Sequence, residues 1–166
     1  PDRFLYVLLR PQWKSWLVRG AYIITSFGGF VSLKLLDNYL QLGLDWLWIP
    51  GLVFAGLGAV YTAFLFNQAR ARDLWQTPIQ SAIHMLVHAI MAGSVVMMII
   101  APESSQWMAS ILLWGIVANV LIIAKEILLP HDTPDTQKAI HLMTKGYYSK
   151  YFWAGIVIGN LIPIVV

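Results

Sequence analysis

Long apolar runs separated by short polar segments set the pattern of this chain. One run, residues 46–66, holds no charged side chain over 21 residues, about the ~20 that an α-helix needs to cross a bilayer. Similar runs recur along the sequence and predict helical spans near residues 14–36, 46–68, 78–101, 107–129 and 150–166. The first four are expected to be complete and to alternate up-down-up-down, and the fifth to be partial. We therefore predict an all-α fold, a polytopic transmembrane helix bundle.

A short helix is predicted between the fourth and fifth spans. Thr133 followed by Pro134 has the form of a helix start, with an N-cap hydroxyl and a proline at the first helical position. The residues that follow predict an amphipathic segment at 134–145. Thr77 and Pro78 give the same signal at the start of the third span, where Gln80 completes a capping box.

Composition supports a membrane location for the whole chain. Only 11% of the 166 residues are charged and 58% are hydrophobic, with a mean hydropathy of +0.67, against roughly 25% charged residues in soluble domains. The absence of Cys excludes a disulfide framework and a thiolate metal or iron–sulfur site within this chain. Basic residues sit at segment ends, which argues against a nucleic-acid partner. We expect a single integral-membrane domain over residues 1–166. Its start at Pro1 and its end in an apolar run favour an interior piece of a longer chain.

Basic residues predict the orientation of the spans. If the segments alternate, nine Arg and Lys residues fall on one side, and only Lys34 falls near the other. The positive-inside rule then assigns residues 70–78 and 130–150 to the cytoplasm, and residues 37–45 and 102–106 to the outer face. We expect a multi-pass protein of the bacterial cytoplasmic (inner) membrane.

Two histidines lie inside a predicted span. His84 and His88 are four residues apart and so share one helix face. An imidazole can gain or lose a proton near neutral pH, which favours a proton relay. A packing role, with each ring satisfied by a neighbouring hydroxyl or carbonyl, is an equal alternative. Haem ligation is less favoured, because a bis-histidine haem needs imidazoles from two facing helices.

Charged residues at the helix ends complete the candidate proton pathway. Arg70 and Asp73 are three residues apart and can pair if the second helix continues through the bend. An interfacial anchor without chemistry explains the same residues. Lys125 and Glu126 are sequence neighbours and do not face each other. The candidate proton-pathway residues are His84, His88, Asp73, Glu126, Lys125, Arg70 and Arg72.

Aromatic and acidic residues gather at the opposite surface, between the first and second spans. The aromatic residues are most simply an interfacial belt. Together with two carboxylates they can also edge a flat, apolar pocket of quinone size. Spacing alone does not choose between these interpretations. The candidate quinone-binding residues are Asp45, Trp46, Trp48, Tyr39 and Asp37.

Three runs of sequence resemble the NrfD/PsrC family, the membrane subunits of polysulfide-reductase-type complexes. The specific part is TAFLFNQARARDLWQTP at residues 62–78. RPQWKSWLVRGAYI at residues 10–23 and GYYSKYFWAGIVIGNLIP at residues 146–163 are also similar to that family. The residues that stand in the motif positions are Arg72, Asp73, Leu74, Trp75 and Pro78.

The resemblance implies a haem-free subunit of a respiratory complex such as alternative complex III. It would exchange electrons between a membrane quinone, either menaquinone or ubiquinone, and a partner iron–sulfur subunit, with or without proton translocation. With no Cys and no convincing haem pair, the electron carrier belongs to a partner chain. No quinone contact is transferred to a residue by the motif match. The rival interpretations are a haem b-type membrane anchor, an ion or proton transporter, and a purely structural anchor.

Overall fold

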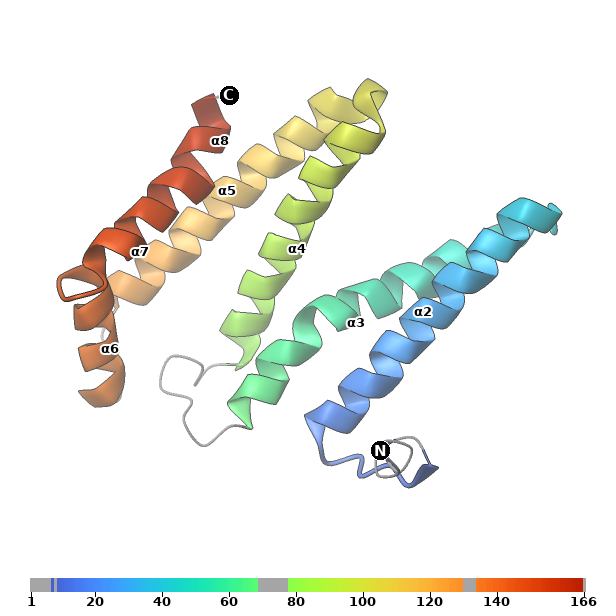
Figure 1. Ribbon diagram of the computed structural model, residues 1–166, viewed down its shortest axis with the longest axis horizontal. Helices are drawn as coiled ribbons and strands as arrows, with labels where there is room; N and C mark the ends of the chain where they lie inside the picture. The colour runs from blue at the N-terminus through green and yellow to red at the C-terminus, as the bar shows by residue number, and fades with distance from the viewer. Residues whose placement is uncertain (1–6, 8, 69–77, 130–133, 166) are drawn as a thin grey trace. The chain divides into compact units, whose positions relative to one another are not determined.

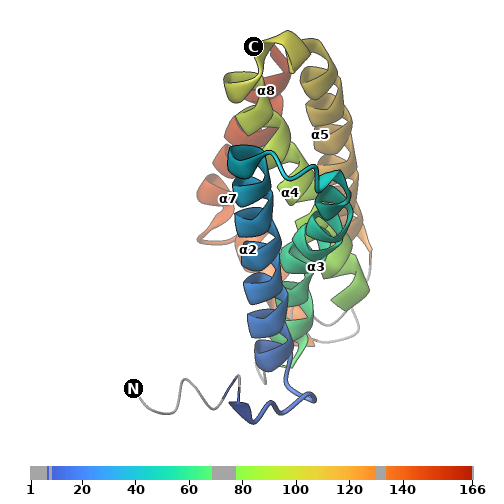
Figure 2. The same ribbon diagram turned by 90° about the vertical axis from the view of Figure 1, so that its right-hand side faces the viewer.

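Every regular element that the structure describes is helical (Figures 1 and 2). The computed structural model describes residue 7 and residues 9–68, 78–129 and 134–165. In chain order the elements are α2 (Trp16–Leu40), η1 (Asp45–Leu47), α3 (Trp48–Asn67), α4 (Pro78–Ile100), η2 (Pro102–Ser104), α5 (Ser105–Leu128), α6 (Pro134–Thr144), α7 (Ser149–Ile156), the π-helix η3 (Val157–Leu161) and α8 (Ile162–Val165). The chain divides into two compact units, residues 1–86 and 87–166, and α4 runs through the boundary.

Four helical segments are long and apolar enough to cross a membrane. They are Trp16–Leu40, Asp45–Asn67, Pro78–Ile100 and Pro102–Leu128, with 25, 23, 23 and 27 residues. Each exceeds the ~20 residues that a bilayer requires. The predicted all-α bundle with four complete spans is confirmed, and its helices are those of a multi-pass membrane protein.

The helix ends differ from the predicted ones mainly at α2. The apolar pattern predicted an end near residue 36, yet α2 continues to Leu40 and ends at Gln41, whose φ is 53°. The extra turn contains Asp37, which pairs with Lys34 one turn earlier. A paired carboxylate is compatible with a helix interior, so its charge does not mark the helix end. The capping box expected at Thr77 lies outside the described residues.

Few apolar side chains are covered within the described part of the chain. Its buried hydrophobic residues are Val18, Leu47, Ala63 and Ile116. Large apolar side chains are exposed on all four long helices. Such surfaces are costly in water but suit contact with lipid tails or further helices.

In the first unit, α2 and α3 lie side by side (Figure 1). A small residue permits their closest approach, because a Cβ at Gly20 would lie 2.3 Å from the Tyr61 ring. Ala63, also on α3, is fully buried. Trp16 stacks on Phe64 with ring centroids 4.4 Å apart. Small residues at Gly20 and Ala63 therefore allow α2 and α3 to pack closely.

Two side chains fasten the start of α2. The Gln68 side chain, just past the end of α3, accepts a hydrogen bond from Trp16 N at 2.9 Å and donates to the Lys14 carbonyl at 3.0 Å. Arg19 reaches back toward the helix start, where its Nε donates to the Trp13 carbonyl at 2.6 Å. Its guanidinium also lies 4.7 Å from the Trp16 ring centroid. Arg19 therefore snorkels toward the helix start, as a charged residue near a span end is expected to do.

In the second unit, α5 contacts its neighbours through small and polar residues. A Cβ at Gly115 would lie 2.6 Å from Met91 Cγ, so glycine allows α4 and α5 to approach closely. Gly146 ends α6 and donates to the His141 carbonyl at 2.8 Å. Trp153 Nε1 then donates to the Thr144 carbonyl at 3.1 Å. These contacts return the chain from α6 into α7, which continues through η3 and α8 (Figure 1).

Candidate functional site

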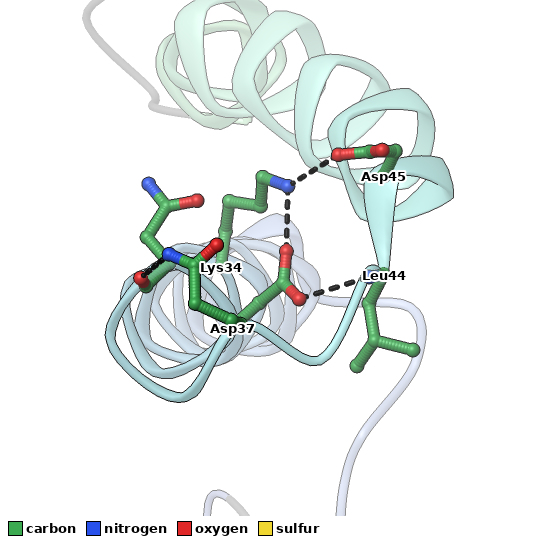
Figure 3. Close-up of polar contacts among 6 residues, drawn as sticks. Lys34, Asp37, Leu44 and Asp45 are labelled. Atoms are coloured by element: carbon green, nitrogen blue, oxygen red, sulfur yellow. Dashed lines mark hydrogen bonds and ion pairs between the residues drawn. The ribbon is translucent and has the colours of Figure 1, made fainter.

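The first polar site joins the end of α2 to the start of the next span. Lys34 Nζ lies 2.6 Å from Asp37 Oδ2 and 3.1 Å from Asp45 Oδ1 (Figure 3). Asp37 Oδ1 also accepts a hydrogen bond from Leu44 N at 2.8 Å. Gly43, with φ of 72°, provides a left-handed conformation in the turn between them. We call Lys34, Asp37 and Asp45 the ion cluster.

The two carboxylates of the ion cluster differ sharply in exposure. The Asp37 side chain is 4% exposed and uses both oxygens, one on Lys34 and one on Leu44 N. The Asp45 side chain is 93% exposed while its Oδ1 accepts from Lys34. Asp37 therefore fixes the turn, whereas Asp45 presents an oriented carboxylate to its surroundings.

The structure brings two of the five candidate quinone-binding residues into direct contact with one cation. Asp37 and Asp45 both bind Lys34, which was noted at this surface but not included among the candidates. The three candidate aromatic residues are exposed: Tyr39 by 85%, Trp46 by 59% and Trp48 by 60%. Exposed aromatic residues at a helix end suit an interfacial belt and the edge of a pocket equally.

The second polar site lies deep within the predicted membrane span of the second unit. His88 Nε2 lies 2.9 Å from Asn119 Oδ1, and Asn119 Nδ2 donates to Asn160 Oδ1 at 2.7 Å. Asn160 Nδ2 donates in turn to the Ile156 carbonyl at 3.2 Å. Both asparagines are 4% exposed. We call His88, Asn119 and Asn160 the histidine–amide chain; it links α4, α5 and η3.

The three members lie at similar depths. At 1.5 Å per residue, His88 is about 15 Å from the start of α4, Asn119 about 14 Å from the end of α5, and Asn160 about 16 Å from the start of α7. Half of a ~30 Å hydrocarbon layer is about 15 Å. If the spans alternate as predicted, these three helix ends lie on one side, and the histidine–amide chain would then lie near the midplane of such a layer.

A backbone carbonyl fixes the direction of the hydrogen bonds. The Ile156 carbonyl can only accept, so the Asn160 group bonded to it is the amide NH₂. Asn160 Oδ1 then accepts from Asn119 Nδ2, which leaves Asn119 Oδ1 as the acceptor for His88. His88 Nε2 must therefore carry a hydrogen. In the neutral ring, a further proton binds at Nδ1.

The π-helix η3 explains how Asn160 reaches its partner. Pro163 has no N–H to donate to the Gly159 carbonyl, so an α-helical hydrogen bond is missing at this point. The helix widens to a π-turn at Val157–Leu161, and π-turns often occur at functional sites. No buried side-chain nitrogen or oxygen among the described residues lacks a hydrogen-bond partner. The amides are thus accommodated at a depth where unpaired polar groups are costly.

The remaining candidate proton-pathway residues are spread along the chain. His84 is half-buried one turn before His88 on α4. Glu126 is half-buried and Lys125 exposed near the end of α5. Glu126 lies seven residues, about 10 Å, from Asn119. Arg70, Arg72 and Asp73 lie outside the described residues.

Asn160 is the functional candidate that the sequence analysis missed. Its signal is a lone amide inside an uncharged apolar run, three residues before a proline. Asn119 gives a similar signal, a lone amide inside the apolar part of the fourth span. Comparisons of this chain with models of protein families, with curated proteins and with solved structures found no match.

Proposed function

We propose that this chain is a quinone-interacting subunit of a respiratory oxidoreductase complex in the bacterial cytoplasmic membrane. It passes electrons between the quinone pool and a partner iron–sulfur subunit. The resemblance of residues 62–78 to the NrfD/PsrC family motivates the proposal. The observation that carries it is the ion cluster, where Lys34 orients the exposed carboxylate of Asp45 at the end of membrane-spanning helices.

The chemistry of a quinol matches such a carboxylate. Oxidation of a quinol to a quinone releases two electrons and two protons, so a base must lie within hydrogen-bond reach of a ring hydroxyl. In the proposal Asp45 accepts one of the two protons while Lys34 holds the carboxylate in position, and the second proton passes to water at this exposed helix end. The exposed faces of Trp46 and Trp48 provide apolar surface for the ring. The electrons leave to the partner's cluster, because this chain has no Cys to hold one.

Proton movement forms the second part of the proposal. The histidine–amide chain holds the His88 ring by Nε2–H, and in the proposal Nδ1 is the nitrogen that accepts the proton. Near the midplane, such a ring can take a proton from one side and release it to the other. This geometry also supports the transporter alternative, which predicts proton movement without any redox partner.

The proposal is tested by Asp45→Asn in the intact complex. This change keeps the shape of the side chain but removes its basicity, so quinol turnover should fall at least tenfold, a barrier increase of about 1.4 kcal/mol. Asp135→Asn is the matched control, because Asp135 is also exposed and lies 3.7 Å from a lysine; its turnover should stay at the wild-type value. Assays at several quinol concentrations separate kcat from KM.

Two results would count against this function. If Asp45→Asn oxidises quinol at the wild-type rate, the ion cluster is not part of the quinone site. Proton uptake by proteoliposomes that contain the chain without its iron–sulfur partner and without quinol establishes the transporter instead.

A further inference from the structure

Two cavities in the second unit share two lining residues, and we treat them together as one groove. The first, of about 440 Å³, lies between the end of α5 and α6 and includes His141 and Lys145 in its lining. The second, of about 240 Å³, lies between α5 and α7 and is lined only by aliphatic and aromatic side chains, Trp153 among them. Ile127 and Leu128 line both cavities. The groove therefore has a polar end and an apolar end that meet at these two residues.

The groove crosses the boundary expected between headgroups and lipid tails. The apolar helix α5 ends at Leu128, and the amphipathic helix α6 follows outside it. From Leu128 the apolar end extends along α5 to Val120, about 12 Å at 1.5 Å per residue. The bond from Trp153 Nε1 to the Thr144 carbonyl ties the α7 wall to the polar end. A ligand in this groove would have one end at the surface and the other in the hydrocarbon.

The charge of the lining selects the kind of headgroup. Lys145 carries a positive charge at the polar end, and His141 adds a second basic nitrogen group. No carboxylate is among the described residues that line either cavity. Lys138, on α6, does not line the groove and lies 3.7 Å from Asp135. Among the described lining residues, the charged and titratable groups are therefore basic.

We propose that this groove binds an anionic phospholipid. Its phosphate lies at Lys145 and His141, and one acyl chain lies between α5 and α7 against Ile123 and Trp153. Basic pockets between helices on the cytoplasmic side suit acidic headgroups, and residues 130–150 were assigned to that side by their charge. A neutral quinone ring gains little from a charged lysine, which makes it a poorer occupant. This inference does not depend on the proposed redox function.

Native mass spectrometry of the detergent-purified complex tests the proposal. After equilibration with equal amounts of phosphatidylglycerol and phosphatidylcholine, the wild type should retain the anionic lipid preferentially. Lys145→Gln should lower that preference about fivefold, the contribution expected of one lysine near an anionic headgroup. Lys138→Gln removes the same charge from α6, seven residues earlier and outside the groove, and should leave the preference unchanged. A parallel experiment with cardiolipin shows whether one or two phosphates are preferred.

A second pair of variants tests the apolar end. Ala124→Trp fills the cavity between α5 and α7 and should lower retention of both lipids. Leu121→Trp places the same ring at an exposed position of α5 that does not line the groove, and should retain lipid as the wild type does. Equal retention of both lipids by the wild type, or equal loss in Lys138→Gln and Lys145→Gln, overturns the proposal. Recovery of a quinone or a peptide segment cross-linked at position 123, in place of lipid, also overturns it.

Discussion

The ion cluster and the histidine–amide chain hold helices together by opposite means. The ion cluster uses charged side chains no more than 11 residues apart, and Asp45 in it is almost fully exposed. The histidine–amide chain uses side chains 31 and 41 residues apart, and its two amides are almost fully buried. One site lies at a helix end and the other near mid-span.

The difference follows from the cost of charge in hydrocarbon. At a helix end, water and headgroups solvate Asp45 while Lys34 orients it, so a full charge is tolerated there. Near mid-span an unpaired charge is expensive, and neutral amides that satisfy one another are the cheaper way to join helices. The ion cluster is thus suited to meet a ligand from outside. The histidine–amide chain is suited to fix helix positions and one ring nitrogen of His88.

The largest expected effect is at the centre of the histidine–amide chain. Asn119→Leu keeps the branched shape of the side chain but removes two interhelical hydrogen bonds, each worth about 1–2 kcal/mol in model membrane helices. The free energy of unfolding should therefore fall by about 2–4 kcal/mol. Reversible denaturation in mixed micelles measures this. Ser110→Ala is the control on the same helix, because Ser110 bonds only its own helix at Gln106; its change should stay within about 0.5 kcal/mol. Equal stabilities of the two variants contradict the structural role of Asn119.

A smaller effect is expected where α2 approaches α3 in the first unit, and it shows how much this contact contributes beside the ion cluster. Gly20→Ala drives a methyl group into the Tyr61 ring and should lower the free energy of unfolding by about 1–3 kcal/mol. Gly28→Ala, on the same helix with nothing within 4 Å of the new Cβ, should leave the protein equally or slightly more stable. If Gly20→Ala and Gly28→Ala have the same free energy of unfolding, the contact at Gly20 contributes little to the pairing of α2 with α3. The ion cluster then becomes the main candidate for holding these two helices together.

The smallest effect is the response to salt. Raising ionic strength from about 0.1 to 1 M shortens the Debye length from ~10 to ~3 Å. The exposed Asp45 should lose part of its attraction to Lys34, so backbone hydrogen exchange at residues 41–47 should accelerate by up to about twofold. Exchange around Asn119 should not respond, because its bonds are neutral and buried. Asp45→Asn should abolish the salt dependence, and a salt response in Asp45→Asn as large as in the wild type would assign it to other charges.

Local patterns predicted part of each site. Lys34 and Asp37 are three residues apart, so their pairing can be read from helical periodicity once α2 is known to continue past residue 36. The sequence placed His88 inside an apolar run. Its contact with Asn119 was not predicted, because periodicity gives the face of a helix but not which face of another helix it meets. The quinone site, the proton pathway and the NrfD/PsrC resemblance remain predictions.

The sequence by itself determined the helical class, the four long spans and the helix between the fourth and fifth. Uncharged runs of bilayer length leave the backbone no partner except itself, which forces helices whatever they pack against. Only the tertiary structure decided that Asp45 forms an ion pair with Lys34 and that Asn160 accepts a hydrogen bond from Asn119. The first contact depends on the left-handed turn at Gln41 and Gly43. The second depends on a π-turn and on close approach of separate helices, and a one-dimensional pattern of apolar and polar residues does not encode these distances.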